Sequence, residues 1–160
     1  MPKDVEVSLR KFSDYFKGFE NVEAVKQIFG SKTEKVLDVL QVEFTTRWGY
    51  MSVSEEDGHI VVSTYYLKNG EEKEIYLDII HELVHVKQFM EGKKLFDEQF
   101  EYVKRPTEIA AYKHAVEEAR RIGMTEEEIY EYLQTEWMSE KDIKNLADTV
   151  GVKPKYPQRK

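Results

Sequence analysis

The chain has 160 residues and a formal net charge of −7, and this length suits a single domain that buries a hydrophobic core without cross-links. It contains no cysteine, which excludes a disulfide framework and every thiolate zinc site. The acidic balance argues against generic nucleic-acid binding, which needs a basic surface. No uninterrupted apolar stretch has membrane-spanning length, so a soluble cytoplasmic protein is expected.

Helices are expected in the first forty residues. An apolar periodicity predicts a first helix with Asp4 as its N-cap and Gly18 as its end. A second helix is predicted to follow the cap residue Asn21 and to end at Gly30, and a third to cover 33–40. These segments contain no cluster of titratable residues, so they are interpreted as structural.

The next segment changes from a helical to an alternating apolar pattern, which predicts strands at 41–45, 50–54 and 59–64. An acidic turn at 55–58 precedes the last strand, which should lead directly into a helix at 71–91. The expected fold class is therefore α+β, with a small, mainly antiparallel, three-stranded sheet. An edge strand beside the helix could bind an extended peptide by strand addition, although the plainer interpretation is that the sheet only covers the core.

An H-E-x-x-H motif, His81-Glu82-Leu83-Val84-His85, lies within the amphipathic segment 71–91. On a helix the two histidines are about 40° apart and Glu82 is about 100° from His81, so all three share one face. This spacing lets two imidazoles reach one zinc ion and places a carboxylate to take a proton from zinc-bound water. A solvated helix face is the plainer alternative, but the strong amphipathicity favours a metal site.

A third metal ligand must come from the chain after the motif. Four acidic residues lie far enough beyond the end of the helix for the chain to return to the two histidines: Asp97, Glu98, Glu101 and Glu108. Glu108 is preferred because Pro106 marks the start of a helix there. Small residues on the same helix face would let two helices approach closely. The competing explanation is that acidic residues favour the first turn of any helix through its dipole.

The remaining histidines have weaker signals. His59 follows the acidic turn and could be a third ligand or an oxyanion donor, but a surface position on a hairpin is the simpler interpretation. His114 lies about 240° around the helix from Glu108 and is expected to face away from the metal. A tyrosine could steady the oxyanion, and no motif singles one out among Tyr65, Tyr66 and Tyr112.

Two more helices are expected before a basic C-terminal tail. Thr125 and Glu128 form a capping box for one, and Ser139 begins another that Gly151 ends. From Ser139 onward, six basic and three acidic residues give a formal charge of +3, against −10 for the preceding chain. Such a tail could lie across an acidic cleft and hold an enzyme latent, whereas a frayed terminus is the plainer interpretation.

The motif at 81–85 and the stretch Arg105-Pro-Thr-Glu-Ile-Ala-Ala-Tyr112 together resemble the gluzincin zinc metallopeptidases, and among them the small minigluzincins. The resemblance covers roughly 41–123. It implies a small twisted sheet, an active-site helix beneath it and a glutamate helix behind. It also implies that His81, His85 and Glu108 bind zinc, with Glu82 as general base and acid. Tyr112 departs from many larger gluzincins, which have an acidic residue at that position.

The expected function is therefore hydrolysis of a peptide or protein substrate by a zinc-bound water that Glu82 activates, with one zinc ion per chain. Minigluzincins are zymogen-like with blocked clefts, so the resemblance also implies a latent state. Two alternatives stay open. One is a zinc-binding regulatory or structural domain with little activity, and the other is a stress-response protease that acts on a DNA-binding repressor.

Overall fold

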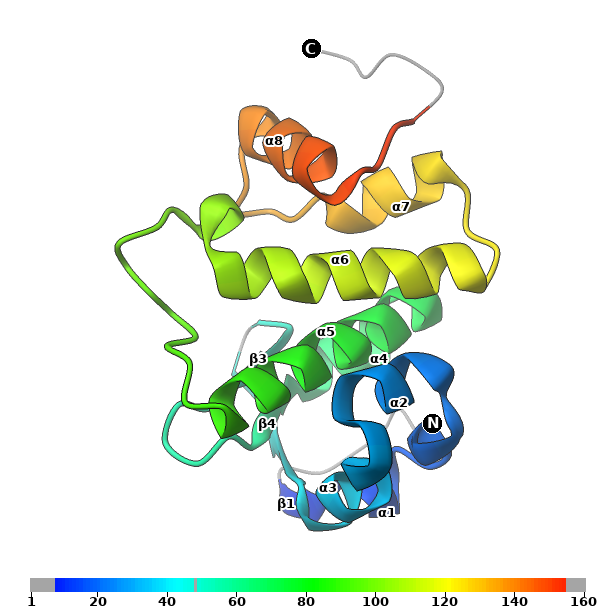
Figure 1. The fold of residues 1–160 in the computed structure, drawn as a ribbon, viewed down its shortest axis with the longest axis vertical. Coiled ribbons are helices and arrows are strands. Elements are labelled where there is room, and N and C mark those ends of the chain that lie inside the picture. The colour runs from blue at the N-terminus through cyan, green and yellow to red at the C-terminus, as the bar shows by residue number, and fades with distance from the viewer. Residues whose placement is uncertain (1–7, 48, 155–160) are drawn as a thin grey trace. The chain divides into compact units, whose positions relative to one another are not determined.

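The structure, a computed structural model, describes residues 8–47 and 49–154. The chain divides into two compact units, Met1–Lys93 and Lys94–Lys160. Helices predominate and the first unit contains a small sheet, which confirms the expected α+β class (Figure 1). The expectation that residues 1–160 form one domain stays a prediction. None of the described helices is both long enough and apolar enough to pass through a membrane.

The first described element is a strand, β1 (Ser8–Lys11), so the prediction of a helix through this segment is wrong. β1 pairs antiparallel with β2 (Gln41–Thr45), and this pairing overrides the local helical pattern. The helical part is limited to α1 (Phe12–Tyr15). Asp4, the predicted N-cap, lies outside the described residues.

The next two helices largely follow the predictions. They are α2 (Glu23–Phe29) and α3 (Thr33–Val39), and a short 3-10 turn precedes each: η1 (Phe19–Asn21) and η2 (Gly30–Lys32). Gly30 ends α2 as predicted, with a positive φ of 61° that suits glycine. Val22 rather than Asn21 is the N-cap of α2, because Asn21 belongs to the 3-10 turn.

The sheet has four strands in the order β1-β2-β4-β3, with β3 (Met51–Val53) and β4 (Ile60–Ser63) at two of the predicted positions. The prediction of three mainly antiparallel strands missed β1 and the parallel pairing of β2 with β4. β2 and β4 are the two inner strands of this order, and parallel strands are normally buried. Both strands bury their apolar residues almost completely: Val42, Phe44, Ile60 and Val62.

A short helix, α4 (Thr64–Asn69), separates β4 from the motif helix, so the predicted direct connection is wrong. The Ser63 hydroxyl caps α4 by accepting a hydrogen bond from the Tyr66 amide, a signal that the sequence analysis overlooked. The predicted motif helix is confirmed as α5 (Glu72–Met90), and Gly92 follows it with a φ of +80°. α5 packs against β3 and α2 within the first unit.

The described part of the second unit, residues 94–154, contains η3 (Tyr102–Lys104) and three helices: α6 (Pro106–Arg121), α7 (Glu126–Leu133) and α8 (Glu140–Val150). All three helices were predicted. Both hydrogen bonds of the Thr125–Glu128 capping box are present, and Ser139 caps α8. Most of the predicted basic tail, Lys155 to Lys160, lies outside the described residues.

Candidate metal centre

The two motif histidines converge on one point beside α5. Their Nε2 atoms are 3.2 Å apart, and their rings are inclined at 77°. Zinc–nitrogen bonds of about 2.0–2.1 Å in a tetrahedral arrangement put two ligand nitrogens about 3.3 Å apart. The side chains are buried, with 5% of His81 and 3% of His85 exposed. The pair therefore fits two corners of a zinc site without rearrangement.

Burial of the opposite side of α5 keeps this pair in place. Ile75, Ile79, Ile80 and Leu83 are almost completely inaccessible to solvent. A helix packed in this way cannot rotate without exposing apolar surface, so its polar face stays fixed. The helical spacing of the motif and the packing of the helix act together to hold both imidazoles.

His85 has a hydrogen-bond partner that the sequence analysis missed. Its Nδ1 lies 2.7 Å from Oε1 of Gln88, whose side chain is 4% exposed. Because an amide oxygen only accepts, Nδ1–H of His85 donates in this contact. The signal in the sequence was an amide residue three positions after the second motif histidine, on the same helix face.

Glu82 occupies the position expected of a general base. It follows His81 directly on α5, and its side chain is buried. Helical geometry keeps it within about 100° of that histidine. One face of α5 thus supplies two imidazoles that could bind a metal and a carboxylate that can accept a proton.

Glu108 lies in the second unit, in the first turn of α6, and only 3% of it is exposed. The Thr107 hydroxyl donates a 2.9 Å hydrogen bond to the Leu95 carbonyl, which anchors the start of this helix. The helix dipole favours an acidic residue here but does not require burial, and buried carboxylates normally bind a cation or a hydrogen-bond donor. Glu118, also buried on α6, does so by accepting two hydrogen bonds from Arg121.

The other candidate third ligands differ from Glu108 in exposure. Glu98 and Glu101 are exposed, and Asp97 is half-buried with its carboxylate accepting a hydrogen bond from the Gln99 amide. His81, His85 and Glu108 are all buried, and each offers one ligand atom. Imidazole nitrogen and carboxylate oxygen are ligand types that zinc accepts.

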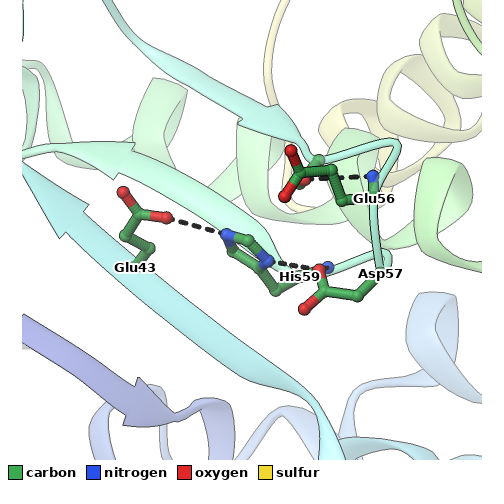
Figure 2. Close-up of polar contacts among 5 residues, drawn as sticks. Glu43, Glu56, Asp57 and His59 are labelled. Atoms are coloured by element: carbon green, nitrogen blue, oxygen red, sulfur yellow. Dashed lines mark hydrogen bonds and ion pairs between the residues drawn. The ribbon is translucent and has the colours of Figure 1, made fainter.

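His59 lies between two carboxylates in the first unit (Figure 2). Its Nε2 is 2.8 Å from Oε1 of Glu43 on β2, and its Nδ1 is hydrogen-bonded to Asp57 in the preceding turn. Burial lowers the pKa of His59, but the bonds to Asp57 and Glu43 outweigh it and leave the pKa raised. The bond to His59 lowers the pKa of Asp57. An imidazole that donates from both ring nitrogens to carboxylates has no lone pair for a metal, which favours the hairpin interpretation of His59.

Tyr66 is one of the three tyrosines considered for the oxyanion. Its hydroxyl donates a hydrogen bond to Asp78, one turn before His81 on α5. Burial, reinforced by the Asp78 carboxylate, raises the pKa of Tyr66 well above its usual range. Tyr66 therefore keeps its proton and donates it in the hydrogen bond to Asp78. This contact joins α4 to α5.

The other residues of this group do not single out an oxyanion donor. The Tyr112 and Tyr102 hydroxyl oxygens are 2.8 Å apart, and Tyr65 is 53% exposed. His114 is half-buried near the middle of α6.

Comparison with protein-family models, with curated proteins and with solved structures gives no match for this chain. The resemblance to gluzincins is therefore carried by the two motifs alone, the one on α5 and the one that opens α6.

Proposed function

We propose that the protein is a zinc-dependent metallopeptidase in which His81, His85 and Glu108 bind the metal and Glu82 transfers the proton. The observation that carries the proposal is the 3.2 Å separation of the two histidine Nε2 atoms, which matches the spacing of two ligands on one zinc ion. The burial of Glu108 supports a carboxylate as the third ligand. When bound, zinc supplies a Lewis acid that lowers the pKa of water and polarises a peptide carbonyl.

The protein residues have two further roles in this proposal, binding the metal and transferring a proton. With His81, His85 and Glu108 as its protein ligands, a zinc ion would keep one coordination position for water or substrate, as in catalytic rather than structural zinc sites. Glu82 takes a proton from the attacking water and delivers it to the amide nitrogen as the C–N bond breaks. The proton thus passes through a single carboxylate, and the products are a carboxylic acid and an amine.

We further propose that the substrate is an extended peptide bound beside β3. This strand ends the order β1-β2-β4-β3, so its pairing with β4 occupies only one of its edges within the described sheet. β3 also packs against α5, the helix that carries the motif. Backbone hydrogen bonds to such an edge would align a peptide along it.

The test is cleavage of a mixed peptide library by the zinc-loaded full chain. Glu82→Gln keeps the shape of the side chain but removes the base, so hydrolysis should fall by about 10²- to 10⁴-fold while zinc stays bound. The matched control is Glu72→Gln, an exposed carboxylate on the same helix, which should cleave like the wild type. Equal rates for wild type and Glu82→Gln would contradict the assigned role.

A zinc-binding regulatory or structural domain is the second candidate. The burial of Glu82 and both histidines favours it, because a catalytic zinc site must admit water and substrate. The same assay separates the two functions, since this domain would hold zinc without cleaving any peptide. Deletion of residues 155–160 completes the test, because a latent peptidase held by its basic tail would gain activity.

A further inference from the structure

We infer that Gln88 is a positioning residue of the proposed metal centre, and that its side-chain oxygen holds His85 in the tautomer whose Nε2 can bind a metal. The inference rests on the proposed function, because His85 is one of the proposed ligands. It adds a residue outside the H-E-x-x-H motif, one turn further along α5.

Geometry and burial make this contact strong. The distance of 2.7 Å from His85 Nδ1 to Gln88 Oε1 is at the short end of the range for N–H···O hydrogen bonds. Both side chains are buried, so little water competes for either group. Since residues three apart are neighbours on a helix, α5 itself provides the alignment.

The chemistry of the acceptor fixes the proton. An amide oxygen cannot donate, so the proton of the neutral imidazole resides on Nδ1 and the lone pair on Nε2. The opposite orientation of the amide would donate to Nδ1 and place the proton on Nε2, where it would block metal binding. Gln88 therefore favours the one tautomer of His85 in which Nε2 can be a ligand.

The uncharged acceptor matters as much as its position. A carboxylate beside an imidazole stabilises the charged ring, as Asp57 and Glu43 do for His59. An amide orients His85 without adding a negative charge next to it. Loss of such an outer partner typically weakens metal binding by about 10- to 100-fold.

The experiment compares three variants of the full chain: Gln88→Met, Gln88→Glu and Lys87→Met. Methionine has nearly the length of glutamine but no comparable acceptor, glutamate restores an acceptor oxygen, and Lys87→Met is a control at the neighbouring position of α5. Nitrogen-15 NMR of metal-free protein reports the tautomer of His85, and competition with a chromogenic chelator reports zinc affinity. Circular dichroism checks that each variant is folded.

We expect His85 of the wild type to carry its proton on Nδ1. Gln88→Met should populate both tautomers and bind zinc about 10- to 100-fold more weakly. Gln88→Glu should restore the proton on Nδ1 but not the full zinc affinity, because its carboxylate also stabilises the charged ring. The inference is overturned if Gln88→Met keeps the wild-type tautomer and binds zinc as tightly as Lys87→Met. If the wild type binds no zinc while Gln88→Met still changes the tautomer of His85, the proposed function fails. The inference that Gln88 fixes the tautomer of His85 is then still supported.

Discussion

The first unit contains two histidine clusters that are built in opposite ways. His85 has an amide oxygen at Nδ1, and its Nε2 faces the Nε2 of His81. His59 has a carboxylate at each ring nitrogen. Two carboxylates need two N–H donors, so they stabilise the charged ring, whereas one amide oxygen needs only one donor and leaves a lone pair. On this account the charge and number of the acceptors, rather than burial alone, determine which ring nitrogen keeps a lone pair for a metal.

The two clusters also hold different parts of the first unit together. The His59 cluster links β2 to the turn before β4, and Figure 2 shows the ring between the two acidic side chains. The His81–His85 pair belongs entirely to α5. Changes to the first cluster should therefore alter stability and its pH dependence, and changes to the second should alter metal binding.

The largest expected effect is on the proposed third ligand. Glu108→Ala should weaken zinc binding by more than the roughly 10- to 100-fold typical of outer partners, because it removes a ligand rather than its support. Chelator competition measures the change. Glu117→Ala, an exposed carboxylate on the same helix, is the control and should bind zinc like the wild type. Equal affinity of the Glu108 and Glu117 variants would remove Glu108 from the site.

The turn that carries His59 depends on Gly58. This residue has a φ of +81°, and a Cβ there would lie 2.5 Å from the Phe89 ring of α5. We expect Gly58→Ala to lower the free energy of unfolding by about 1–3 kcal/mol more than Gly92→Ala, measured by denaturant titration. Gly92 is a matched control, since its φ is +80° and nothing lies within 4 Å of an added Cβ. Equal losses in the two variants would show that the Phe89 contact costs nothing.

The smallest effect is the pH dependence of the His59 cluster. A raised pKa for His59 adds stability that is complete below about pH 6.5 and is lost as pH rises through the folded-state value. A lowered pKa for Asp57 adds stability that is complete above about pH 4 and is lost as pH falls below it. The cluster therefore contributes most between about pH 4 and 6.5.

The measurement is the unfolding free energy of wild type and His59→Gln across this range. We expect the free energy of unfolding of the wild type to be higher by up to about 1 kcal/mol near pH 6 and by less near pH 9. The effect is small because the side chains of Glu43 and Asp57 are 37% and 61% exposed, so water weakens both ion pairs. If the difference in unfolding free energy between the two proteins stays constant from about pH 6 to about pH 9, Asp57 and Glu43 do not stabilise the charged form of His59.

The elements that local chemistry determines were predicted well from the sequence. The motif helix, the capping box at Thr125 and the glycine that ends α8 all occur where expected. Each depends on residues within a few positions of one another, through helical periodicity, side-chain capping or a positive φ. The H-E-x-x-H geometry belongs to this group, because one helix sets it.

The errors in the sheet came from contacts between distant residues, whereas α4 was missed although its cap, Ser63, is a local signal. β1 was predicted to be helical because its pairing with β2, whose residues lie thirty or more positions away in the sequence, leaves no local signal. The parallel pairing of β2 with β4 likewise depends on which strands share the core. The contact of His59 with Glu43 on β2 was missed for the same reason. Gln88 was within reach of local reasoning, since it lies one turn from His85.

The central claim is that the His81–His85 pair binds a metal and that His59 does not. Elemental analysis of wild type, His85→Ala and His59→Ala, purified identically without chelator or affinity tag, tests it most directly. We predict about one zinc ion per chain in wild type and His59→Ala, and loss of most of it in His85→Ala. The account is contradicted if the wild type binds no divalent metal after zinc is added back, or if His59→Ala loses its metal as completely as His85→Ala.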